Sequence, residues 1–198
     1  MKLIIASNNA HKIREIKEIL GSYFVEIKSL KEAGISHETV EDGRTFLENA
    51  EKKAREIAEI SGCAALADDS GICAHALGGE PGIYSARYSG EHGGHGDDEA
   101  NNDLLIKNLA DKDDKGAHYT CAVVVCYPDG KKISAEGHMY GRIIDTRRGT
   151  HGFGYDPIFV PDGHNRTVAE MTDEEKHAIS HRGKALRAIL EKIKDKKD

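Results

Sequence analysis

The chain of 198 residues contains no apolar run near the roughly 18 residues that a membrane span requires. Its first residues, MKLIIA, form too short an apolar stretch for a signal peptide. An excess of positive charge is also missing, because the formal net charge is -6, and this argues against a protein that binds duplex nucleic acid. The composition therefore predicts a soluble, cytoplasmic protein without a membrane partner.

Cysteine pairs of the C-x-x-C type, internal repeats and low-complexity linkers are absent as well. The four cysteines are expected to stay reduced, with most of them acting as small core residues. The motif G-x-x-x-x-G-K-[ST] is missing, which excludes a P-loop. The length is sufficient for a core without disulfide staples, and we expect one domain over residues 1–198.

The apolar pattern predicts an α/β protein with a mixed sheet flanked by helices. Strands are expected over 2–7, 64–67, 119–127, 132–137, 141–145 and 157–160. Helices are expected over 11–20, 46–60 and 99–109, from a capping box at Thr172 toward Ser180, and around 186–193. The strand over 64–67 is expected to end at Asp68-Asp69, and Pro128-Asp129-Gly130 is expected to close a hairpin in the middle of the sheet.

A polar segment, Ser7-Asn8-Asn9-Ala10-His11-Lys12, connects the first expected strand to the first helix. Such a segment presents free backbone N–H groups and the positive end of a helix dipole, and Lys12 adds a full charge. It is therefore a candidate phosphate site. The alternative is an ordinary helix cap by Asn8 or Asn9, and the residues alone favour neither interpretation.

Carboxylates occur at two places that a fold could bring together. Asp68 and Asp69 follow an apolar run, and Glu41 precedes a capped helix that carries Lys53. These are hard oxygen ligands of the kind that Mg²⁺ binds beside substrate phosphates, and one of them could orient or deprotonate a water. The alternatives are a turn at Asp68-Asp69, an exposed loop acid at Glu41 and a solvated side chain at Lys53.

Two further segments carry residues suited to a nucleobase. Gly152-Phe153-Gly154-Tyr155-Asp156-Pro157 places an aromatic ring between glycines, where it can stack on a base or pack in the core. Lys176 and Ser180-His181-Arg182 lie near a helix end, as hydrogen-bond donors or as complements to the helix dipole. Together the segments supply phosphate binding, a divalent metal, a general base, a stacking ring and donors for a base edge.

Six ordered motifs resemble those of the inosine/xanthosine triphosphate pyrophosphatases, and the resemblance spans nearly the whole chain. They are SNNAHK at 7–12, EDGRTFLENA at 41–50 with Lys53, ADDSG at 67–71, LGGEPGIYSARY at 77–88, GFGYDPIF at 152–159 and EEKxxISHR at 174–182. The resemblance implies an elongated mixed β-sheet with two lobes and the active-site cleft between them. It also implies Mg²⁺-dependent hydrolysis of XTP, ITP or dITP to the monophosphate and pyrophosphate.

The resemblance carries over to individual residues. Glu41 and Asp69 match the metal ligands, with Asp68 as a further candidate, and Asp69 also matches the catalytic proton acceptor. Phe153 matches the ring that stacks on the purine. The full set of implied substrate-binding residues is Ser7, Asn8, Asn9, Ala10, His11, Lys12, Lys53, Ser70, Phe153, Gly154, Tyr155, Asp156, Lys176, His181 and Arg182.

The chain departs from the family pattern at His75, where many members have an aspartate, and this argues against an acidic role there. His92 and His95, in a glycine-rich segment, are expected to be solvated rather than to bind a transition metal. Family members are commonly homodimers, and Ile83 and Tyr84 are candidate contact residues.

Three other functions compete with this interpretation. A Maf-type nucleotide pyrophosphatase prefers other bases, and the segments GFGYD and SHR favour the purine family instead. A nucleotide-binding regulator without turnover would not need Lys12, Lys53, Glu41 and Asp69 together. A phosphatase acting on small phosphate esters would need neither Phe153 nor residues that read a base.

Overall fold

A computed structural model describes residues 2–90 and 97–195, which form two compact units. The first unit takes the described residues of Met1–Asp69, Cys121–Gly137 and Arg182–Asp198. The second takes those of Ser70–Thr120 and His138–His181. Each unit is therefore assembled from segments that lie far apart in the sequence.

The strands form one six-stranded sheet in which β1 pairs in parallel with β2 and β3, while β5 and β6 are antiparallel. The prediction of an α/β protein with a mixed sheet and flanking helices is confirmed. Three long strands contribute residues to both units. The order in the sheet is β2 (Glu26–Ser29), β1 (Lys2–Ile5), β3 (Ala64–Ala74), β4 (Gly116–Cys126), β5 (Lys132–Ile143) and β6 (Phe159–Pro161).

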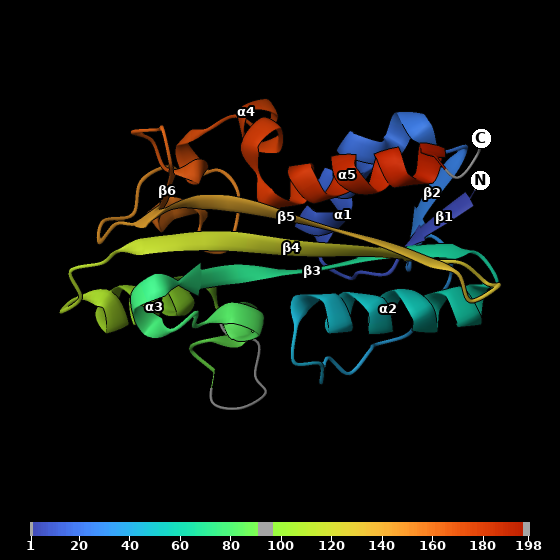
Figure 1. Ribbon diagram of the computed structural model, residues 1–198, viewed down its shortest axis with the longest axis horizontal. Helices are drawn as coiled ribbons and strands as arrows, with labels where there is room; N and C mark the ends of the chain where they lie inside the picture. The colour runs from blue at the N-terminus through green and yellow to red at the C-terminus, as the bar shows by residue number, and fades with distance from the viewer. Residues whose placement is uncertain (1, 91–96, 196–198) are drawn as a thin grey trace. The chain divides into compact units, whose positions relative to one another are not determined.

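In the first unit the strands are covered on both faces, by α1 (Ala10–Leu20) and α5 (His181–Asp195) on one side and by α2 (Phe46–Ser61) on the other (Figure 1). Successive side chains of a strand point to opposite faces. Accordingly Leu66 packs in the cluster with α1 and α5, whereas Ala65 and Ala67 pack in the cluster with α2. Two apolar layers thus hold the strands from both sides.

The helices begin where capping residues predict them. The side chain of Asn9 accepts a hydrogen bond from the backbone N–H of Lys12 at the start of α1, and Thr45 does the same for Glu48 at the start of α2. Thr172 forms a complete capping box that opens α4 (Asp173–Ile179). These contacts confirm the expected starts of α1, α2 and α4.

The second unit has its own core. Side chains from β3 to β6 pack there against α3 (Asp98–Leu109) around Ile72, Leu105, Tyr119, Met139 and Phe159. Short 3-10 turns connect the elements: η2 (His75–Leu77), η3 (Gly82–Arg87), η4 (Asp156–Ile158) and η5 (Val168–Glu170). A further one, η1 (Gly21–Tyr23), follows α1 in the first unit.

Several strand boundaries differ from the prediction. β3 does not end at Asp68 but continues to Ala74, because it pairs with a neighbour along the sheet despite its polar sequence. The two short strands expected over 132–137 and 141–145 are one strand, β5. β2, which is short and half-buried, was not predicted at all. The hairpin joining β4 to β5 is confirmed, with Gly130 at a φ of 82°.

None of the helices in the part of the chain that the structure describes has the length and apolar character that crossing a membrane requires.

Candidate active site

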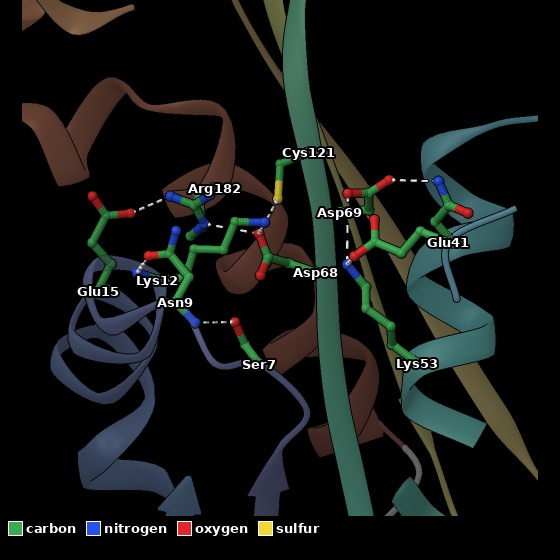
Figure 2. A network of polar contacts seen from close by, with 11 residues as sticks. Ser7, Asn9, Lys12, Glu15, Glu41, Lys53, Asp68, Asp69, Cys121 and Arg182 are labelled. Carbon is green, nitrogen blue, oxygen red and sulfur yellow. Dashed lines mark hydrogen bonds and ion pairs between the residues drawn. The ribbon is translucent and has the colours of Figure 1, made fainter. Parts of the chain in front are cut away.

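Asp68 and Asp69 lie side by side in β3 and point to opposite faces of that strand (Figure 2). Asp68 continues the row of Leu66 toward α1 and α5, and Asp69 continues the row of Ala67 toward α2. The turn that the sequence allows at this position is therefore not formed. The two carboxylates serve two separate clusters of charge.

The cluster on the face of α1 and α5 is a chain of buried ion pairs. Lys12 Nζ lies 3.2 Å from Asp68 Oδ2, and Arg182 Nε donates to the same oxygen at 3.1 Å. Arg182 Nη1 in turn donates to Oε2 of Glu15. The side chain of Asp68 is 0% exposed and that of Arg182 only 2%, so each charge depends on its partners for stabilisation.

Electrostatics keep Asp68 ionised. Burial alone would raise the pKa of this carboxyl, but the positive charges of Lys12 and Arg182 outweigh burial, so the pKa lies below its ordinary value. Cys121 Sγ lies 3.9 Å from Asp68 Oδ2, and burial raises the pKa of its thiol. The result is a negative charge at neutral pH that fixes the ammonium group of Lys12, whose side chain remains 15% exposed.

The cluster on the face of α2 brings Glu41 and Asp69 to one cation. Lys53 Nζ lies 3.2 Å from Glu41 Oε1 and 3.6 Å from Asp69 Oδ1 (Figure 2). The side chain of Lys53 is only 12% exposed, so the alternative of a solvated lysine is wrong. Asn49, in α2, donates to Asp69 Oδ2 at 3.1 Å.

The surroundings on the two faces of β3 shift the pKa values of Asp68 and Asp69 in opposite directions. Burial raises the pKa of Asp69 above its ordinary value, and the attraction of Lys53 and Lys12 offsets this only in part. Burial lowers the pKa of Lys53, but the carboxylates of Asp69 and Glu41 outweigh it and raise the pKa overall. A carboxylate with a raised pKa in a cluster of charges is suited to accept a proton.

The polar segment between β1 and α1 caps the helix and leaves several of its residues exposed. Asn9 caps α1, and its backbone N–H donates to Ser7 Oγ at 3.2 Å. Asn8, Ala10 and His11 are nevertheless exposed, beside the positive end of the helix dipole. The cap interpretation is confirmed, and it leaves the segment accessible to an anion.

In the second unit Asp156 organises the residues suited to a base. Its Oδ2 accepts from Lys176 Nζ at 2.9 Å and from the backbone N–H of Phe153 at 3.0 Å. Lys176 Nζ lies 4.7 Å from the centre of the Phe153 ring. Asp156 and Lys176 are both nearly fully buried, whereas Phe153 is only half-buried.

Tyr119 and His181 form a stacked pair next to that cluster. Their rings are 4.5 Å apart and inclined by 7°, and Tyr119 Oη donates to Asp156 Oδ1 at 3.4 Å. His181 and Arg182 begin α5 rather than end α4, so cations there oppose the helix dipole. The dipole interpretation is therefore wrong for these two residues, although Lys176 does lie in the last turn of α4.

The remaining candidate substrate residues are held in different ways. Ser70 is half-buried in β3. The backbone N–H of Gly154 donates to Asp98 Oδ2 at 2.7 Å. Tyr155 is buried, and its hydroxyl donates to the carbonyl of Ser85 at 2.8 Å, so this ring belongs to the core.

Within residues 2–90 and 97–195, no three His, Cys, Asp or Glu side chains are grouped so as to hold a metal ion. His75 is exposed, and its Nε2 lies 3.1 Å from His118 Nδ1, so no acid occupies that position. The expectation for His92 and His95 lies outside the described residues.

Three residues of these clusters were not predicted from the sequence, although for two of them the sequence contained an indication: a polar residue on a helix face that is otherwise apolar. Glu15 is three positions after Lys12 and on the apolar face beside Ile16, where an acid is unusual. Asn49 adjoins Ala50 on the buried face of α2. Tyr119 is the first residue of the apolar run over 119–127, and nothing in the sequence around it indicates a functional contact.

Comparison with known proteins points to one family. A sequence model described as the Ham1 family matches residues 3–192. A dITP/XTP pyrophosphatase of Clostridium perfringens is 50% identical over 98% of this chain and 97% of its own length. Another, of Streptomyces coelicolor, is 45% identical over 98% of each chain.

Solved structures agree in fold with this chain. The Ham1 protein of Staphylococcus aureus has a TM-score of 0.87 at 37% identity, covering 99% of this chain and 100% of that one. A HAM1 protein of Coxiella burnetii has a TM-score of 0.88 at 35% identity, covering 98% of this chain and 99% of that one.

Proposed function

The chain belongs to the Ham1 family, and we propose that it hydrolyses the deaminated purine nucleoside triphosphates dITP, ITP and XTP to the monophosphate and pyrophosphate. Relatives at 45% to 50% identity carry the name dITP/XTP pyrophosphatase. The observation that carries the proposal is the pair of charge clusters around Asp68 and Asp69, each of which fixes a partly exposed lysine.

The triphosphate would bind to residues of the first unit. Exposed backbone at Asn8, Ala10 and His11 surrounds the positive end of the α1 dipole, which favours phosphate. Lys12 and Lys53 would neutralise phosphate charge, because their ammonium groups are positively charged and lie among the residues of the proposed site. Ser7, Asn9 and Ser70 would add polar contacts.

Glu41 and Asp69 form a donor set that fits Mg²⁺. Both carboxylates face one position, where the ammonium of Lys53 now makes contact with them. A pair is sufficient, because Mg²⁺ is usually bound by one or two carboxylates, with water and substrate phosphates completing its shell. Asp68 is turned to the opposite face of β3, so the proposed site does not include it.

The chemistry would be an attack of water on the α-phosphorus. A bound Mg²⁺ would neutralise charge on the phosphate oxygens. Asp69 would accept the proton of the attacking water, a role that a carboxylate in the active site can fill. The new bond joins the water oxygen to the α-phosphorus, and the bond to the oxygen bridging α and β breaks, releasing pyrophosphate.

Base selectivity would come from the second unit. Hypoxanthine and xanthine present an O6 acceptor where adenine presents an amino donor. Lys176 and His181 would donate to that edge, with Phe153 stacking on the ring and Asp156 holding Lys176 and Phe153 in place. Arg182 would act through Asp68, to which it is bound.

Product analysis tests the proposed reaction. Phosphate and pyrophosphate release would be measured with Mg²⁺ for XTP, ITP, dITP, GTP and ATP. We expect pyrophosphate from the first three nucleotides and little turnover of the others. Similar turnover of ATP and GTP, or orthophosphate as the sole product, would exclude the proposed function.

Phe153→Leu tests the contact with the base. Loss of the stacking ring is expected to raise KM for dITP and XTP by about fivefold to 150-fold, since stacking on one base contributes about 1–3 kcal/mol. Inorganic triphosphate serves as the control, because it has no base and its inhibition constant should stay at the wild-type value. If Phe153→Leu weakened the binding of the nucleotides and of inorganic triphosphate equally, Phe153 would lie outside the base site.

We further propose that the protein acts in the cytoplasm as a homodimer and does not bind duplex nucleic acid. Tyr84 is 55% exposed, which fits a contact residue, and Arg87 lies 5.3 Å above its ring. Sedimentation of the wild type beside Tyr84→Ser would show whether a dimer forms and whether this ring contributes to it.

A further inference from the structure

Asn49 links the carboxylate of Asp69 to the backbone of the segment that carries Glu41. It lies in α2 and is only 1% exposed. Its side chain has a partner at each end: Oδ1 accepts from the backbone N–H of Gly43 at 2.8 Å, and Nδ2 donates to Asp69 Oδ2 at 3.1 Å. Gly43 follows Glu41 by two residues.

The direction of the amide is fixed by its partners. A backbone N–H can only donate and an ionised carboxylate can only accept, so Oδ1 must face Gly43 and Nδ2 must face Asp69. No other polar side chain of similar size offers both an acceptor and an N–H donor at one end of a short stem. An aspartate would repel Asp69, and a leucine would satisfy neither partner.

The segment that carries Glu41 approaches Asn49 very closely. A Cβ atom added to Gly43 would lie 2.6 Å from Asn49 Oδ1 and 2.9 Å from Glu48 Cβ. A glycine is therefore required for the segment to reach this position without displacing it. The contact fixes where Glu41 leaves the backbone relative to α2.

The same amide determines how Asp69 presents its charge. With Oδ2 bound to Asn49, the other oxygen, Oδ1, is the one that faces Lys53, which also contacts Glu41. We infer that Asn49 is a positioning residue that sets the relative placement of the Glu41 and Asp69 carboxylates for a divalent cation. The inference rests on the proposed function of that site.

Metal binding without nucleotide tests this role directly. Mn²⁺ serves as the probe, because carboxylates bind it as they bind Mg²⁺ and free Mn²⁺ is measured by electron paramagnetic resonance. Asn49→Leu is expected to weaken Mn²⁺ binding by about tenfold to a hundredfold, as is usual when a group that orients a metal ligand is removed. Gly43→Ala tests the same contact from the other side.

Asn101 provides a matched control. It is also a helical asparagine, 2% exposed, and its Oδ1 accepts from the backbone N–H of Ser89 while its Nδ2 donates to the carbonyl of Ala86. Asn101→Leu and Asn49→Leu should lower the midpoint of thermal unfolding alike. Only Asn49→Leu should also weaken Mn²⁺ binding.

Two results would overturn the inference. One is wild-type Mn²⁺ affinity in both Asn49→Leu and Gly43→Ala, which would leave Asn49 with a role in stability alone. The other is Mn²⁺ binding by the wild type that Glu41→Gln does not weaken, which would place the cation elsewhere. Because no nucleotide is present, failure of the proposed reaction would not produce either result.

Discussion

Asp69→Asn is expected to lower kcat by about 10²- to 10⁴-fold while the free energy of unfolding stays the same or rises. The loss follows because the asparagine cannot accept the proton of the attacking water. It also removes one of the two carboxylates that face Lys53. Steady-state kinetics and urea unfolding in metal-free buffer at pH 7 measure the two effects.

Asp69→Asn lowers activity but is not expected to lower the free energy of unfolding, because the pKa of Asp69 is raised in the folded protein. When the pKa of an acid is higher in the folded state than in the unfolded state, folding disfavours its ionised form. Its charge therefore destabilises the protein at pH values above the folded pKa. Removing the charge relieves that cost, while Lys53 loses the attraction of Asp69 but keeps its ion pair with Glu41.

Thermal unfolding with Mg²⁺ supplies the control. The ion should raise the midpoint for the wild type, because it binds only the folded chain, and should do so far less for Asp69→Asn. A variant that keeps its turnover, or that unfolds far more readily than the wild type, would contradict the assignment of Asp69.

Asp68→Asn, in contrast to Asp69→Asn, is expected to lower the free energy of unfolding, by about 3–5 kcal/mol at pH 7. Asp68 is fully buried between Lys12 and Arg182, so its removal leaves the buried guanidinium of Arg182 with one carboxylate fewer and takes away the carboxylate that faces Lys12. Urea unfolding measures the difference. Turnover should also fall, because Lys12 loses the group that fixes it.

The pH dependence of this difference can be stated with its sign. The pKa of Asp68 is lower in the folded state than its ordinary value of about 3.9, so its charge stabilises the fold above that value. The stabilisation is lost as the pH falls below about 4 through the folded pKa. The wild type and Asp68→Asn should therefore converge in stability at acidic pH.

An exposed pair of similar length serves as the comparison. Arg147 Nη2 and Asp103 Oδ1 are 2.8 Å apart, and the side chain of Asp103 is 71% exposed. Asp103→Asn should cost less than about 1 kcal/mol, because solvent screens exposed pairs. If Asp68→Asn costs no more than Asp103→Asn, the buried chain of charges contributes nothing to stability.

Much of the fold follows from local sequence. Asn9, Thr45 and Thr172 begin helices where their capping patterns predict them, because a cap acts only on the turn that follows it. The apolar runs of β1 and β4 likewise identify buried strands. These features depend on neighbours in the sequence, so the sequence reveals them.

The extent of β3 could not be predicted in the same way. Asp68-Asp69-Ser70-Gly71 has the composition of a turn, and only pairing with a distant strand holds it extended. The six motifs supplied the candidate site residues and grouped Glu41 with both aspartates, but they did not predict that Asp68 lies in a separate cluster with Lys12 and Arg182. Once β3 is known to continue, the alternation of a strand places Asp68 and Asp69 on opposite faces.

The remaining features of the site that could not be predicted are contacts between residues far apart in the sequence. Arg182 meets Asp68 and Glu15, and Asn49 meets Asp69, across separations that no local pattern encodes. Lys53 illustrates the same limit, since its helix position allows either solvent or a buried ion pair. The carboxylates of Glu41 and Asp69 decide between them.

Hydrolysis of dITP in water enriched in ¹⁸O is the most direct measurement of the proposed reaction. Attack on the α-phosphorus would place the label in the nucleoside monophosphate and leave the pyrophosphate unlabelled, which mass spectrometry of the two products would show. Label in the pyrophosphate, or release of labelled orthophosphate, would mean that water attacks elsewhere and would contradict the proposed role of this site.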